Sequence, residues 1–144
     1  MTHKDAGGYS QKHGAGKKPN PRLAEAIREG AEKGQISCAR VFTIASEAGV
    51  SPSEAGKAVD LLEIKLTKCQ LGLFGYRPGK SIVKPAEQVS PELAAAIRGR
   101  LLDGRLPCSQ AWQIAEEMKL KKMDVSSAAE ALGIKIKPCQ LGAF

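Results

Sequence analysis

Four cysteines carry the most reactive side chains of this sequence, and they form two equally spaced pairs. Cys38 and Cys69 are followed 70 positions later by Cys108 and Cys139. Two cysteines of one pair can form a redox-active disulfide, and all four together can supply the ligands of a tetrahedral metal site. Cysteine is also among the residue types most often buried as simple packing, and no pair has C-x-x-C spacing. The pattern leaves three interpretations open: redox pairs, a four-thiolate metal site, and core thiols.

The cysteine spacing belongs to an internal repeat. Residues 21–74 align without a gap onto 91–144, with 20 of 54 positions identical, and both copies end in Cys-Gln-Leu-Gly. A constant period of this kind indicates a tandem duplication of one small module. We expect a basic tail over residues 1–20, repeat 1 over 21–76, a linker over 77–90 and repeat 2 over 91–144.

Each repeat predicts three helices followed by a short hairpin. In repeat 1, Asn20, Ser37 and Ser51 are placed to cap three successive helices, and Gly34 to end the first one. Alternating apolar residues over 63–69 then predict a strand. The Gln-Leu-Gly that follows is expected to be a turn anchored by its leucine, with 73–76 returning as the partner strand. The matching residues of repeat 2 predict the same elements.

The stretch 38–64 resembles the helix-turn-helix families of bacterial regulators. Ala45 is small where the two helices would cross, and Gly49, four residues later, can make the turn. With the hairpin, the resemblance implies a mainly α fold with small β-hairpins (α+β), built as two tandem winged helix-turn-helix-like repeats. Repeat 2 departs at Lys119, which replaces the turn glycine. A non-glycine residue with positive φ costs about 1 kcal/mol, so we expect the second turn to be looser or differently shaped.

The resemblance implies that the third helix of each repeat approaches the major groove of DNA. Its predicted exposed positions include Asp60 in repeat 1 and Ser126 in repeat 2. The predicted contact residues include no Arg, Asn or Gln suited to bidentate base recognition, so we expect contacts mainly with phosphates. The candidate nucleic-acid-binding residues are Lys17, Lys18, Ser51, Ser53, Lys57, Lys119, Lys121, Lys122, Ser126 and Ser127.

Composition narrows the function classes. Twenty-two basic against 15 acidic residues give a net charge of +7, much of it in the tail and linker. Such a balance is typical of nucleic-acid binding. No apolar run reaches the roughly 20 residues of a membrane span, and no apolar signal segment opens the chain, so a cytoplasmic protein is expected. No nucleophile–base set, phosphate-binding glycine loop or paired-carboxylate motif is present, so we expect no enzyme and no cofactor.

These observations favour a small, regulator-like protein that binds duplex DNA. The alternative is a protein-interaction adaptor built on winged helices and responsive, through its thiols, to redox state or to a metal ion. Each module of about 54 residues is marginal alone. The two copies are therefore expected to pack on each other or on a second chain, as in a homodimer.

Overall fold

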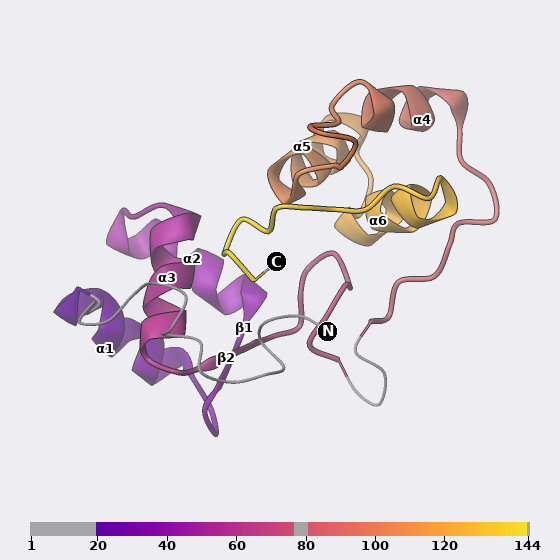
Figure 1. Ribbon diagram of the computed structural model, residues 1–144. Coiled ribbons are helices and arrows are strands. Elements are labelled where there is room, and N and C mark those ends of the chain that lie inside the picture. Colours follow the sequence, from indigo (N-terminus) through magenta and orange to yellow (C-terminus); the bar gives the residue numbers. More distant parts are fainter. Residues whose placement is uncertain (1–19, 77–80, 144) are drawn as a thin grey trace. The chain divides into compact units, whose positions relative to one another are not determined.

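A computed structural model describes residues 20–76 and 81–143 of this chain (Figure 1). Within these residues the fold is a mixture of helix and strand, with six helices and one two-stranded parallel sheet. None of these helices is both long enough and apolar enough to cross a membrane. The elements are α1 (Pro21–Gly30), β1 (Gln35–Ser37), α2 (Cys38–Ala48), α3 (Pro52–Leu61), β2 (Lys65–Thr67), α4 (Pro91–Arg98), α5 (Cys108–Met118) and α6 (Lys122–Ala131).

The chain divides into two compact units whose boundaries differ from those of the sequence repeat. The first unit is Met1–Cys69 with Gln140–Phe144, and the second is Gln70–Cys139. The first therefore contains α1 to α3 with the sheet, and the second contains α4 to α6. Each Gln-Leu-Gly segment belongs to the unit formed by the other repeat.

The predicted helix starts of repeat 1 are confirmed. The Asn20 side chain accepts a hydrogen bond of 2.9 Å from the N–H of Arg22. The hydroxyls of Ser37 and Ser51 accept from the third residue beyond each, at 3.2 and 3.1 Å. These side chains satisfy N–H groups that the first turn of a helix leaves without a partner. Local sequence chemistry thus determines where each helix begins.

The turn between the second and third helices has the same shape in both units. Gly49 after α2 has φ 69° and ψ 29°, and Lys119 after α5 has φ 58° and ψ 42°. The N–H of each residue bonds back to the carbonyl groups at matching positions of its helix. The expectation of a differently shaped second turn is therefore wrong: Lys119 adopts the left-handed conformation despite its side chain.

Replacing Lys119 with glycine is expected to raise the free energy of unfolding by up to about 1 kcal/mol, because the left-handed conformation is strained for a lysine and not for a glycine. The reciprocal change, Gly49→Lys, should lower the free energy of unfolding by a similar amount. Urea unfolding followed by circular dichroism measures both. A loss of stability in Lys119→Gly would contradict the strained turn.

The first helix of each repeat ends earlier than predicted. α1 ends at Gly30, and Gly34 instead forms a tight turn with Lys33, their φ values being 75° and 52°. Two successive positive φ angles are typical of the type I′ turn that joins adjacent antiparallel residues, and Glu32 does pair with Gln35. Asp103 and Gly104 repeat this turn in the second unit, with φ of 52° and 76°.

The predicted winged hairpins are wrong for the described residues. β1 pairs with β2 in parallel, Ile36 opposite Leu66, and the second unit has one parallel bridge from Leu106 to Ile136. Residues 73–76 form no strand. The physical reason is that the chain leaves the first unit after Cys69, so the Gln-Leu-Gly segment cannot return along β2.

The cores are built mainly from aliphatic side chains, because aromatic residues make up only 4% of the sequence. Ile27 and Val41 are completely buried in the first unit. Ile97 and Ile114 are completely buried in the second. Phe42 and Trp112, which occupy matching positions of α2 and α5, are only half-buried. Small aliphatic residues at the helix crossings allow these short helices to pack closely.

Candidate nucleic-acid interface

α3 offers only one open side. Ser51, Ser53 and Lys57 are exposed as predicted, and the Ser51 hydroxyl is engaged in capping the helix. Asp60, in contrast, is only 1% exposed and Gly56 is also buried. The prediction that Asp60 is exposed is therefore wrong. Gly56 lies against the main chain of Leu141, whose carbonyl oxygen is 1.9 Å from the position that a Cβ on Gly56 would take.

Three lysines gather where α6 begins. Lys119 and Lys121 are exposed, and the backbone N–H of Lys121 donates a 3.0 Å hydrogen bond to Asp124 Oδ2. Lys122 is half-buried, and its ammonium lies 4.6 Å from the centre of the Trp112 ring. A cation over an aromatic face is attracted by the ring's negative charge distribution. Lys119 and Lys121 are therefore the lysines of this group most accessible to a phosphate.

The prediction that Ser126 is exposed is wrong. This serine is 1% exposed, and its hydroxyl donates a 2.7 Å hydrogen bond to the carbonyl oxygen of Leu71. Ser127 is half-buried, and its carbonyl oxygen accepts the N–H of Ala86 at 3.0 Å. This side of α6 thus carries the chain that follows Gln70 within the same unit. Sequence reasoning missed it because the contact spans 55 positions of the chain.

The remaining predicted contacts, Lys17 and Lys18, lie outside the described residues. The described candidates therefore form two separate groups, one in each unit. Ser51, Ser53 and Lys57 lie at the start of α3 and on it, and Lys119, Lys121 and Lys122 lie around the start of α6. Each group is exposed or half-exposed and lies at the start or on the open side of a third helix. Neither contains a side chain suited to bidentate base contact.

The four cysteines are present as thiols, each pair within one unit. Cys38, Cys69 and Cys108 are buried, and Cys139 is half-buried. The N–H of Cys108 donates to the carbonyl oxygen of Pro138 at 3.0 Å, which brings the backbones of the second pair together. Over residues 20–76 and 81–143, no group of three or more His, Cys, Asp or Glu side chains is placed to hold a metal ion.

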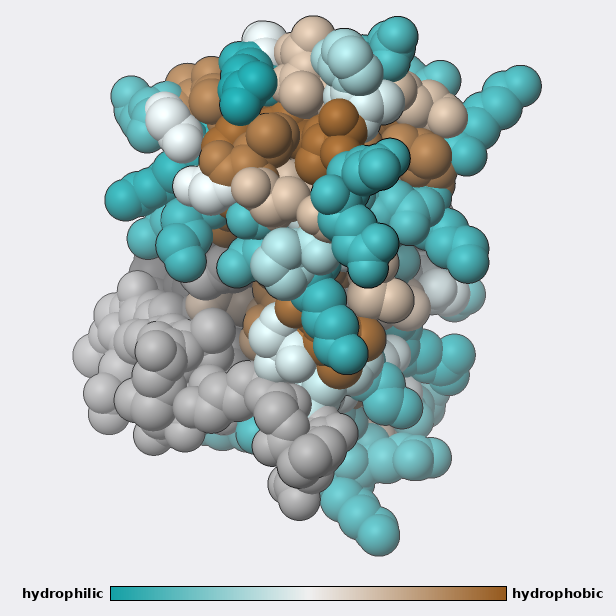
Figure 2. All heavy atoms as spheres, turned by 90° about the vertical axis from the view of Figure 1, so that its right-hand side faces the viewer, coloured by the Kyte–Doolittle hydropathy of each residue, from teal (hydrophilic) through white to brown (hydrophobic). Residues whose placement is uncertain are grey.

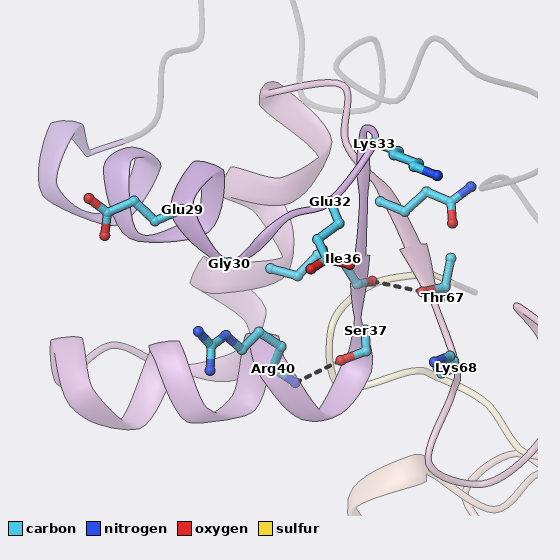
Figure 3. A pocket seen from close by; sticks show the side chains of 10 residues that line it. Glu29, Gly30, Glu32, Lys33, Ile36, Ser37, Arg40, Thr67 and Lys68 are labelled. Carbon is cyan, nitrogen blue, oxygen red and sulfur yellow. Dashed lines mark hydrogen bonds between the residues drawn. The ribbon is translucent and has the colours of Figure 1, made fainter.

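The first unit also contains a polar pocket of about 550 Å³ (Figure 3). It lies among the end of α1, the sheet and the start of α2, where the Thr67 hydroxyl donates to the Ile36 carbonyl oxygen at 3.3 Å. Basic and acidic side chains both line it, so it suits a polar ligand without selecting one charge. Its lining residues are Glu29, Gly30, Glu32, Lys33, Gln35, Ile36, Ser37, Arg40, Thr67 and Lys68. The sequence gives no sign of this pocket, because its lining comes from α1, α2, the two strands and the adjoining turns, which meet only in the folded unit.

Comparison of the chain with protein-family models, with curated proteins and with solved structures yields no match.

Proposed function

We propose that the protein is a small, non-enzymatic, regulator-like module that binds duplex DNA mainly through phosphates. The observation that carries this proposal is the turn shared by both units. Gly49 and Lys119 have the same left-handed backbone conformation, although glycine is the residue that adopts it without cost. This turn joins α2 to α3 in the first unit and α5 to α6 in the second. Two helices joined in this way are typical of helix-turn-helix proteins, which supports the helical part of the resemblance.

The charges support contact with phosphate rather than with bases. Lys57, Lys119 and Lys121 are exposed lysines on or beside the third helices, and lysine binds phosphate as a flexible point charge. The sides of these helices at Gly56 and Ser126 are buried by chain segments. A helix covered there cannot enter the major groove along its whole length, so the open side and the helix start make the contact.

Titration of a labelled duplex at several salt concentrations tests this proposal. We expect weak binding whose log–log dependence on salt has a slope of about −0.9 per phosphate contact. The double variant Lys119→Glu and Lys121→Glu should make that slope shallower by about two contacts. Lys135→Glu with Lys137→Glu is the matched control, because these exposed lysines of the same unit lie outside the α5–α6 turn. Equal losses in the two double variants would indicate net charge alone and overturn the assigned contacts.

A protein-interaction adaptor is the second candidate, favoured by apolar side chains at the surface of the second unit. Figure 2 shows such side chains bordered by hydrophilic ones. Ile82 and Met123 are 43% and 39% exposed, and both contact the position that a Cβ on Gly72 would take, so they adjoin. Absence of duplex binding even at low salt would favour this candidate. In that role the half-buried Cys139 is the thiol that an oxidant or metal ion would reach first.

A further inference from the structure

We propose that the surface of α3 at Gly56 is a docking site for a Gln-Leu-Gly segment, and that a second copy of this chain can supply that segment. We call this surface the α3 docking site and define it by Gly56 and by the core beneath it that receives Leu141. The proposal concerns a different surface from the lysines that carry the DNA-binding proposal and does not depend on it.

The contact at the α3 docking site is made by main chain against main chain. The oxygen, carbon and Cα atoms of Leu141 lie 1.9, 2.6 and 2.8 Å from the position that a Cβ on Gly56 would take. Only glycine leaves room for a backbone this close. The Leu141 side chain is 1% exposed, as is Ala143 beyond the left-handed Gly142. The segment therefore lies directly on the helix with its leucine in the core of the first unit.

The second unit contains a related arrangement, in which a serine side chain rather than the bare helix backbone meets the segment. Ser126 occupies the repeat position of Gly56, and Leu71 that of Leu141. The Ser126 hydroxyl donates a 2.7 Å hydrogen bond to the Leu71 carbonyl oxygen, and Leu71 is completely buried. Gly72 has φ 77°, close to the 80° of Gly142. A small residue facing the leucine carbonyl is thus a shared feature of both sites, not an accident at Gly56.

In both units the docked segment comes from the other repeat. The contacts of Gly56 with Leu141 and of Ser126 with Leu71 join residues far apart in the sequence. They therefore do not depend on how the chain connects the segment to the helix. The connection within one chain sets only the effective concentration of the segment. A segment from a second copy offers identical contacts, which is the condition for domain swapping. Exchange between chains would give a dimer held by the same contacts as the monomer.

The first test uses the full chain carrying Leu141→Asp, which removes the apolar anchor and places a carboxylate where burial is costly. A synthetic peptide of residues 137–144 is added, and hydrogen exchange is measured in each helix. We expect saturable recovery of amide protection in α1 to α3, and no recovery with the same peptide carrying aspartate in place of its leucine. No recovery with the native peptide would overturn the docking site. If Leu141→Asp does not fold, Leu141→Ala takes its place.

The second test is complementation between two chains. The Leu141→Asp chain keeps an intact α3 docking site, and a Gly56→Ala chain keeps an intact segment. Mixing the two at high concentration should produce a heterodimer in sedimentation velocity, whereas each chain alone should remain monomeric at that concentration. A chain carrying both substitutions, mixed with Leu141→Asp, is the matched control and should give none. Absence of the heterodimer across all mixing ratios would overturn the role of a second copy.

Discussion

Gly56→Ala is expected to lower the free energy of unfolding of the first unit by about 3 kcal/mol, an estimate that combines overpacking with partial loss of leucine burial. The new methyl group would lie 1.9 Å from the Leu141 carbonyl oxygen and 2.6 Å from its carbon. Both are backbone atoms, so no rotamer change can relieve the clash. The segment must shift outward from α3, without the hydroxyl contact that Ser126 offers Leu71 in the second unit, and the packing of Leu141 in the core is weakened.

The sign of the change in the free energy of unfolding distinguishes a clash with the docked segment from the ordinary effect of helix propensity. In an open helix, replacing glycine with alanine stabilises by about 1 kcal/mol. Lys57→Ala is the matched control, because Lys57 is the next residue of α3 and is exposed, and it should change stability by less than about 0.5 kcal/mol. Chemical denaturation of the full chain measures both variants. A more stable Gly56→Ala protein would show that Leu141 does not lie on α3.

Leu71→Ala is expected to cost about 3 kcal/mol, within the range measured for truncation of a buried leucine. The damage should appear in α4 to α6, although Leu71 follows β2 closely in sequence. Leu71 is completely buried within the second unit, and its carbonyl accepts the hydroxyl of Ser126 there. Hydrogen exchange resolved by helix should show faster exchange in α4 to α6 and little change in α1 to α3.

Leu141→Ala is the reciprocal control for this prediction. Leu141 belongs to the first unit, so its truncation should accelerate exchange in α1 to α3 and spare α4 to α6. Two variants with crossed patterns would demonstrate that each Gln-Leu-Gly segment completes the core of the unit formed by the other repeat. If each substitution instead loosened the helices of its own repeat, the unit boundaries at Cys69 and Cys139 would be refuted.

Local features of this protein were predictable from the sequence. The capping residues Asn20, Ser37 and Ser51 begin helices as predicted, since a cap is satisfied by backbone groups two or three residues away. The left-handed turn at Gly49 and the positive φ of Gly72 follow from the freedom of glycine. The gap-free repeat correctly predicted three helices in each half of the chain.

Long-range pairing was decided only by the tertiary structure. Parallel pairing of β1 with β2 and the hydrogen bond from Ser126 to Leu71 both join residues distant in the chain, and Asp60 proves to be buried. The candidate site changed accordingly, because the sides of α3 and α6 that seemed open carry docked segments. Ser51, Ser53, Lys57, Lys119 and Lys121 are exposed, as a contact with DNA requires.

Because the two repeats are alike, the sequence alone could not predict on which repeat each Gln-Leu-Gly segment packs. The two repeats share the buried leucine, the left-handed glycine and a small residue on the third helix. A segment docked on its own repeat and one docked on the other repeat would therefore bury nearly the same groups. Sequence patterns record which groups are buried. The chain passes from one unit to the other at Gln70 and again at Gln140, and this path determines which unit buries each leucine.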